Sequence, residues 1–100
     1  MIVIAGSVRI KPDARERAAQ AAGAMAEATR AEPGCRAYRF SSDLNDPTLV
    51  YIYEEWDSPE SLEPHFETAH MSEFRTVLPG LVAGPVSITR YDVSSATRMS

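Results

Sequence analysis

The chain has 100 residues, a formal net charge of −4 and one cysteine, and 44% of its residues are hydrophobic. This length accommodates one domain, and no apolar run approaches the roughly 20 residues that a membrane-spanning helix needs. The acidic balance without a basic cluster predicts no nucleic-acid partner. A lone cysteine cannot form an internal disulfide, and the N-terminus has no secretory signal pattern, so we expect a cytoplasmic protein.

The first predicted elements are a strand and an alanine-rich helix. Residues 2–10 alternate with a period of two and are rich in β-branched side chains, which is typical of a strand. Nine alanines between residues 13 and 31 favour a helix, and its alanine stripe predicts close packing on a support. Asp13 and Glu16 have capping-box spacing, which predicts that the helix begins at Asp13, and the Pro-Gly pair at 33–34 ends it.

A hairpin is predicted next. Residues 35–42 alternate, and residues 48–56 carry the strongest strand pattern of the chain, with Leu49, Tyr51 and Tyr53 on one face. The intervening residues are rich in Asp, Asn and Pro, so the two strands should pair antiparallel through a short turn.

The second half of the chain predicts helices followed by a last strand. Ser58 is an N-cap candidate with Pro59 at the first helical position. Apolar positions then recur at helical spacing, and a further short helix is expected over 72–77. Residues 86–93 alternate as a strand. We expect one domain over residues 1–94 and a frayed tail over 95–100.

The element order is βαββαβ, which predicts an α+β, ferredoxin-like fold with an antiparallel four-stranded sheet and helices on one face. The face without helices carries Leu49, Tyr51 and Tyr53, which favours a homodimer that packs sheet against sheet. The alternative is a monomer with a polar open face.

Several short motifs resemble the antibiotic biosynthesis monooxygenase domain family. The run from Glu54 to Ser58 contains Glu-x-Trp, and His65 and His70 follow it at the family's spacing, the latter within Thr-Ala-His-Met. Glu32-Pro33-Gly34-Cys35 resembles the family's helix-to-strand junction. The similarity covers residues 2 to 93 and is nearest to small stand-alone quinol monooxygenases. It implies a dimeric α+β barrel.

The resemblance implies oxygenation of a quinol, anthrone or other small hydroxylated aromatic by O2, with no flavin, haem or metal cofactor. An electron-rich substrate anion can itself reduce dioxygen. The protein then needs an apolar pocket and a base or hydrogen bond that favours the anion. A non-catalytic, small-ligand-binding dimer of the same fold is the alternative, since one fold serves many functions.

The resemblance also implies the site residues. The candidate catalytic residues are Trp56, His65 and His70. The candidate substrate-binding residues are Ile52, Glu54, Leu62, Phe66, Met71 and Phe74. Trp56 can donate a hydrogen bond to a substrate oxygen or be a core aromatic whose N–H is satisfied internally. Either histidine can be the base, because histidine titrates near physiological pH, or can lie on a helix surface. Glu54 needs a partner if it is buried, and a structural role for it stays open.

Other chemistries find little support in the sequence. Two histidines five apart on one helix diverge by roughly 140°, and there is no His-Glu-x-x-His pattern, so we expect no metal site. Cys35 is more consistent with a small buried residue than with a nucleophile. The haem-degrading branch of the family has an asparagine where this chain reads Ala5-Gly6-Ser7, which disfavours haem. Ile52 and Leu62 replace an asparagine and a tyrosine of the polyketide-tailoring branch, which leaves the substrate open.

Overall fold

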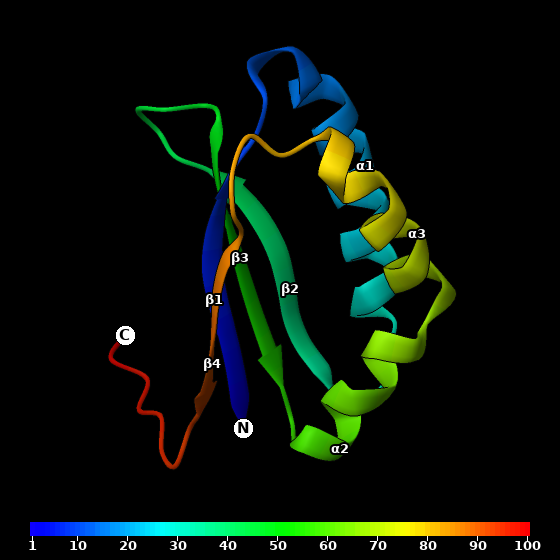
Figure 1. Ribbon diagram of the computed structural model, residues 1–100. Coiled ribbons are helices and arrows are strands. Elements are labelled where there is room, and N and C mark those ends of the chain that lie inside the picture. Colours follow the sequence, from blue (N-terminus) through cyan, green and yellow to red (C-terminus); the bar gives the residue numbers. More distant parts are fainter.

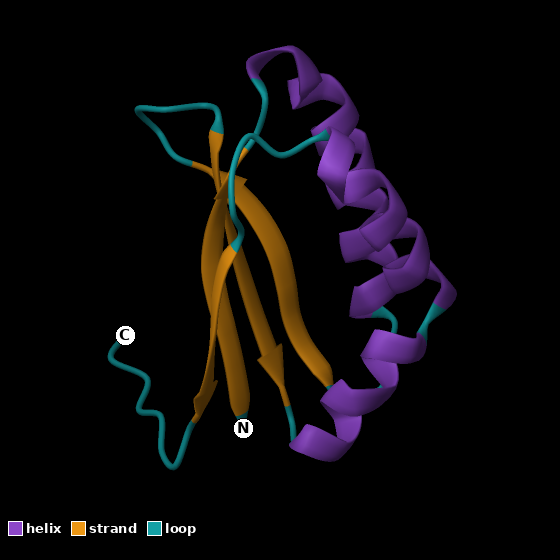
Figure 2. Cartoon of the chain, in the orientation of Figure 1, coloured by secondary structure: helices purple, strands orange, loops and turns teal.

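A four-stranded antiparallel sheet forms one layer of the computed structural model, which describes residues 1–100, and all helices pack on one face of it (Figures 1 and 2). The strands are β1 (Ile2–Arg9), β2 (Cys35–Ser42), β3 (Leu49–Trp56) and β4 (Ser87–Asp92). Their order across the sheet is β2-β3-β1-β4, and every neighbouring pair is antiparallel. The predicted ferredoxin-like fold is confirmed.

The helical layer contains one long helix and a series of shorter ones. These are α1 (Arg15–Arg30), α2 (Pro59–Leu62) and α3 (Ala69–Val77), with 3-10 turns η1 (Pro12–Ala14), η2 (Glu63–Glu67) and η3 (Leu78–Gly80). None of these helices combines the length and the apolar character that crossing a bilayer requires. Helix α3 begins three residues earlier than the predicted short helix.

The two predicted helix starts have different outcomes. The capping box of Asp13 is wrong, because Pro12 opens a 3-10 turn in which the Ala14 N–H donates to the Lys11 carbonyl at 2.9 Å. Helix α1 therefore begins at residue 15 with no side-chain cap. The Ser58 cap is confirmed, since its side chain accepts a hydrogen bond from the Ser61 N–H at 3.2 Å.

The core lies between the helices and the sheet and has two parts. The larger cluster contains Ile2, Ile4, Met25, Ala26, Tyr38, Trp56 and Leu62. The smaller cluster contains Ile10, Ala14 and Leu81, near the opposite end of the strands. Full burial of a large apolar side chain contributes roughly 1.5–3 kcal/mol, so most of the packing energy is concentrated in the first cluster.

Strand β4 is the weakest part of the sheet, because all six of its residues are exposed. Its pairing with β1 depends on Gly6, where an added Cβ would lie 2.1 Å from the Ser87 carbonyl oxygen. After β4, residues 94–100 have no regular structure and lead away from the sheet (Figure 1). The β3 side chains at Leu49, Tyr51 and Tyr53 occupy the face without helices, as their alternation with the buried Glu54 and Trp56 requires.

Candidate active site

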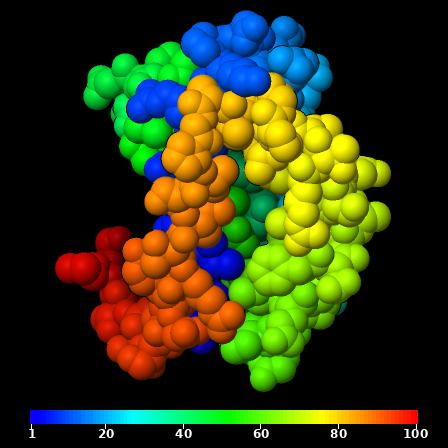
Figure 3. All heavy atoms as spheres, viewed as in Figure 1, coloured from blue at the N-terminus to red at the C-terminus, as the bar shows by residue number.

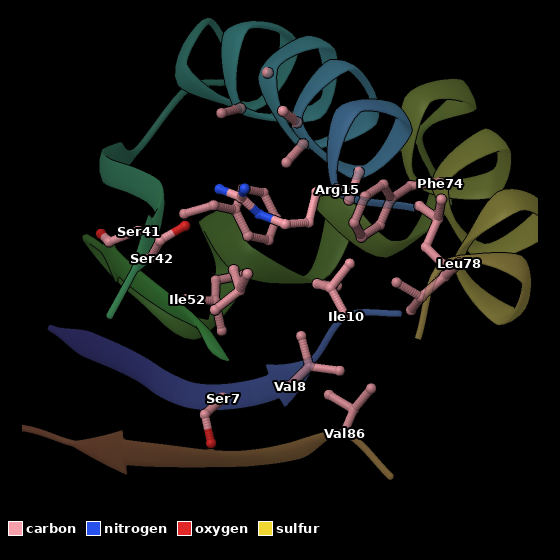
Figure 4. A pocket seen from close by; sticks show the side chains of 18 of the residues that line it. Ser7, Val8, Ile10, Arg15, Ser41, Ser42, Ile52, Phe74, Leu78 and Val86 are labelled. Atoms are coloured by element: carbon pink, nitrogen blue, oxygen red, sulfur yellow. The ribbon is translucent and has the colours of Figure 1, made fainter. Parts of the chain in front are cut away.

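A cavity of about 380 Å³ lies between the sheet and helices α1 and α3 (Figure 4). Fourteen of its 21 lining residues are hydrophobic, so the space suits an apolar ligand. The lining includes Ala26 from the larger core cluster and Ile10 and Leu81 from the smaller one. The cavity thus separates the two halves of the core. In Figure 3 a hollow is visible between α3 and the segment that leads into β4.

Short side chains on α1 leave this space open. Ala18, Ala19 and Ala22 line the cavity. Within the predicted alanine stripe, Ala18 and Ala21 also pack against the smaller core cluster, whereas Ala22 borders the open space. Opposite them, the rings of Phe40 and Phe74 lie 5.7 Å apart and are tilted by 42°. Small residues on the helix and aromatic rings on the other walls give a space for a flat molecule.

A polar cluster of Glu32, His65 and His70 lies near the other end of the helical layer. One carboxylate oxygen, Glu32 Oε2, is 2.7 Å from His65 Nδ1 and 2.8 Å from His70 Nε2. An ionised carboxylate only accepts hydrogen bonds, so both imidazoles donate to it. His65 Nε2 and His70 Nδ1 then remain as proton acceptors. The His65 side chain is 2% exposed and that of His70 24%, so His70 is the more accessible of the two.

Three local features bring this cluster together. Glu32 lies in the turn after α1, and this turn closes with Gly34 at a φ of +83°, in the left-handed region that favours glycine. Pro64 has no N–H to continue an α-helix, and His65 falls in the 3-10 turn η2. Thr68 then has extended backbone and caps α3 through its hydroxyl, which accepts from the Met71 N–H.

The prediction that the two histidines diverge is wrong for this reason. They do not share one helix, because the chain breaks at Thr68, and both rings turn toward Glu32. The carboxylate oxygen and the two ring nitrogens lie within 4.8 Å of one another. A carboxylate with two imidazoles is a donor set that can hold a divalent transition metal.

A second polar pair is buried beside the cluster. The Trp56 indole N–H donates to Glu54 Oε1 at 2.9 Å, and both side chains are buried. Burial raises the pKa of Glu54 to about 7, the negative charge of Glu32 adds to this effect, and the Trp56 hydrogen bond opposes it. Burial likewise raises the pKa of Tyr38, and also that of the half-buried Cys35 thiol.

The cavity and the polar groups meet along three elements. Ile52, Phe40 and Phe74 form the wall nearest the larger core cluster, against which all three pack. On each element the next residue of the same face is polar: Glu54 on β3, Tyr38 on β2 and His70 on α3. Alternate residues of a strand lie roughly 7 Å apart, and residues four apart on a helix have Cβ atoms about 5–6 Å apart. The polar groups therefore stand one side chain beyond the apolar wall.

The predicted site residues lie in different surroundings. Ile52 and Phe74 line the cavity. Glu54, Trp56, Leu62 and His65 are buried, and Met71 packs against the larger core cluster. Phe66 is 42% exposed, because η2 turns it away from the stripe that helical spacing predicts. His70 lies at the edge of the polar cluster, as described above.

Three residues of the site were missed by reasoning from the sequence. Glu32 lies in the Glu-Pro-Gly-Cys motif at the junction of helix and strand, but nothing in this motif indicates that its side chain reaches both histidines. Phe40 could have been found, because it alternates with Tyr38 on the buried face of β2. Arg15 lines the cavity from the first turn of α1 and has no sequence signal of its own.

Comparison with known proteins identifies the family. The family model for antibiotic biosynthesis monooxygenases matches residues 1–77. The chain belongs to this family. The matched residues include Glu32, Glu54, Trp56, His65 and His70, so the whole polar region lies within the family domain. The resemblance inferred from the short motifs is confirmed.

Family relatives cover nearly the whole chain. The Bacillus subtilis protein named "Putative monooxygenase YcnE" is 27% identical over 94 residues, which are 94% of this chain and 99% of that protein. An uncharacterized Synechocystis protein is 33% identical over 93 residues, and this chain spans 63% of its length. The structure of a Deinococcus radiodurans protein described as a "putative antibiotic biosynthesis monooxygenase" matches with a TM-score of 0.91 and 27% identity over 100% of this chain and 99% of that one.

Proposed function

We propose that this protein is a cofactor-independent monooxygenase that oxidises a small hydroxylated aromatic, quinol or anthrone-type substrate with O2. The observation that carries the proposal is the apolar cavity between α1 and the sheet, in a chain of the antibiotic biosynthesis monooxygenase family. Its volume of about 380 Å³ lies in the range of small-molecule sites, roughly 300–1,000 Å³. Phe40, Phe74 and Ile52 offer ring faces and branched side chains to a flat substrate.

In such a reaction the substrate supplies the electrons, so the protein needs no redox group of its own. A hydroxylated aromatic that loses its phenolic proton becomes an electron-rich anion, which can transfer electrons to O2 directly. The protein holds the ring, keeps water away from it and accepts the proton. Apolar walls can hold the ring and exclude water, whereas accepting the proton needs a base at the wall.

We assign the base to His70. Its Nε2–H donates to Glu32, so Nδ1 is the nitrogen that accepts a proton, and the carboxylate stabilises the imidazolium that forms. His70 lies one helical turn from Phe74, which lines the cavity. His65 acts as a positioning residue, because it holds the same carboxylate oxygen from a buried position.

Glu54 and Trp56 form the second polar contribution to this end of the cavity. With its pKa raised to about 7, Glu54 carries a proton in much of the protein near neutral pH. A neutral carboxylic acid can donate a hydrogen bond to a substrate oxygen, and the Trp56 N–H fixes its orientation. Leu62 and Met71 support this end from behind, and the Phe66 ring lies 5.7 Å from that of His65.

One observation favours a second function: the polar groups of the site already have hydrogen-bond partners within the protein. The Trp56 N–H, His65 Nδ1 and His70 Nε2 all have partners within the protein. A network of this kind can serve folding alone, and the protein would then be a non-catalytic dimer that binds a small ligand in the cavity.

Oxygen uptake separates the two functions. The purified protein is incubated with a panel of quinols and anthrones in an oxygen electrode, alongside Ala22→Phe, which fills the cavity, and Ala24→Phe, whose site is exposed on the same helix. We expect the unchanged protein to take up oxygen faster than the uncatalysed reaction. Ala22→Phe should lose this additional uptake, and Ala24→Phe should retain it. Background uptake with every substrate, together with ligand binding that only Ala22→Phe abolishes, would favour the binding protein.

We also propose a homodimer that forms through the open face of the sheet. This face carries Leu49, Tyr51 and Tyr53, and Tyr51 is 41% exposed although its ring is large and partly apolar. Burial of this face against a second copy would remove the apolar surface from water. Light scattering should give about twice the mass of 11.0 kDa, and Tyr51→Lys should shift it to the monomer. A monomer mass for the unchanged protein would refute the dimer.

A further inference from the structure

The charged residues around the cavity are all of one sign. Arg15 and Arg30 are the only charged side chains among the lining residues, and neither aspartate nor glutamate lines the space. This contrasts with the whole chain, in which 14 acidic residues outnumber 10 basic ones. Positive charge beside an apolar wall attracts an anion.

Arg15 is the unpaired member of the two. The arginine–carboxylate pairs of the protein involve Arg9, Arg36 and Arg90, and Arg15 takes part in none of them and in no other side-chain hydrogen bond. Arg30 also lines the cavity, but its position is fixed by a hydrogen bond within the protein, because its Nε donates to the Tyr38 carbonyl at 2.8 Å. Figure 4 shows the Arg15 side chain running from α1 across the cavity toward the end of β2 that carries Ser41 and Ser42.

The position of Arg15 gives the cavity two chemically different ends. Arg15 lies in the first turn of α1, and Ala26, near the inner wall, lies 11 residues further on, a distance of about 16 Å along a helix. The inner wall of Phe40, Ile52 and Phe74 is apolar and can contact an aromatic ring of a ligand. The Arg15 end instead offers a guanidinium and serine hydroxyls. A guanidinium binds a carboxylate through two parallel hydrogen bonds.

We propose that the cavity binds aromatic carboxylates and that Arg15 holds the carboxylate. The inference rests on the proposed function for the ring and its hydroxyl group, and it narrows the substrate class to hydroxylated aromatic acids. The carboxylate lies at the Arg15 end, and the ring with its hydroxyl group points to the inner wall, beyond which Glu54 and His70 stand.

Binding of probes that cannot be oxidised as quinols tests this. Calorimetry of the purified protein uses 2-naphthoate and its methyl ester, which keeps the ring but has no charge. We expect the acid to bind about tenfold more tightly than the ester, the gain typical of one charge-assisted bidentate contact at a partly exposed site. Arg15→Met should remove this preference and leave ester binding unchanged. Arg17→Met, an exposed arginine of the same turn that does not line the cavity, should keep it.

Each outcome bears on the inference separately from the proposed function. Equal affinity for acid and ester, no binding of the acid, or an unchanged preference in Arg15→Met overturns the inference. Charge-selective binding by a protein that oxidises no hydroxylated aromatic would support the anion site and refute the monooxygenase. Turnover of hydroxylated aromatic acids at the same rate and with the same KM in Arg15→Met and the unchanged protein would support the monooxygenase and overturn the role of Arg15.

Discussion

Glu54 should make the stability of this protein depend on pH, and Glu54→Gln should remove that dependence. The carboxyl is 6% exposed, and its pKa is raised from 4.5 to about 7, chiefly by burial. A carboxyl whose pKa is raised on folding binds its proton more tightly in the folded state. Its contribution is complete below pH 4.5 and is lost as the pH rises through 7.

The size of the effect follows from the two pKa values. Each pH unit between them is worth about 1.4 kcal/mol, so the free energy of unfolding should fall by about 3 kcal/mol between pH 4.5 and pH 7 through Glu54 alone. The glutamine variant keeps an oxygen that accepts the Trp56 N–H but has no proton to lose. It should therefore be the more stable protein above pH 7 and lack this slope.

Urea unfolding at fixed protein concentration measures this, at half-unit steps from pH 4.5 to 8. Glu63→Gln, at an exposed carboxylate, is the matched control for the loss of one negative charge and should run parallel to the unchanged protein. The reasoning about Glu54 is refuted if the curves of the unchanged protein and Glu54→Gln are parallel over the whole range. It is also refuted if Glu54→Gln loses stability at pH 8.

The other predictions concern the polar cluster and the turn that holds it. His70→Gln should lower turnover by about 10²–10⁴-fold with a melting temperature near that of the unchanged protein, because it removes the base while the ring site stays intact; undiminished turnover would exclude His70. Treatment with a chelator should leave oxygen uptake unchanged. Uptake that is lost and then restored by a divalent metal would instead assign an ion to Glu32, His65 and His70. Gly34→Ala should cost at least about 1–2 kcal/mol in urea unfolding, because the residue has a φ of +83° and its new Cβ would lie 2.3 Å from Ser61 Cβ. A smaller loss would show that the turn can relax without it.

The strands and the fold were predictable because the residues that the alternating sequence pattern assigns to one face are the ones that face the helices in the structure. On β3, Ile52, Glu54 and Trp56 face the helices and Tyr51 and Tyr53 face away, as a period of two requires. The element order then leaves few topologies, and the observed one follows. Helix boundaries were less well predicted where proline acts, since Pro12 delays α1 and Pro64 turns the expected helix into η2.

The polar cluster could not be derived from the sequence, because its geometry depends on three separate elements. Glu32 comes from the turn after α1, His65 from η2 and His70 from the first turn of α3. Their meeting depends on the direction in which the chain leaves Thr68, and the spacing of these residues along the sequence does not give that direction. A short side chain on α1 permits close approach, but the larger residues around it decide where contact is made: Ala21 packs against the smaller core cluster, whereas Ala22 lines the cavity.

The charged and polar groups along the cavity favour one orientation of a bound ligand. The end near β2's last residues has a free guanidinium, and the opposite wall has a carboxyl of raised pKa and an imidazole one side chain behind it. A ligand with an anionic group and a hydroxyl group on opposite sides of a ring would satisfy both ends at once, whereas the reverse orientation would bring its carboxylate toward Glu32, whose negative charge already helps to raise the pKa of Glu54. Like charges in a site of low dielectric repel strongly. In the proposed reaction, the arrangement that favours loss of a proton at the inner wall therefore also disfavours the reversed ligand, so the orientation of the ligand and the loss of its proton would depend on the same residues.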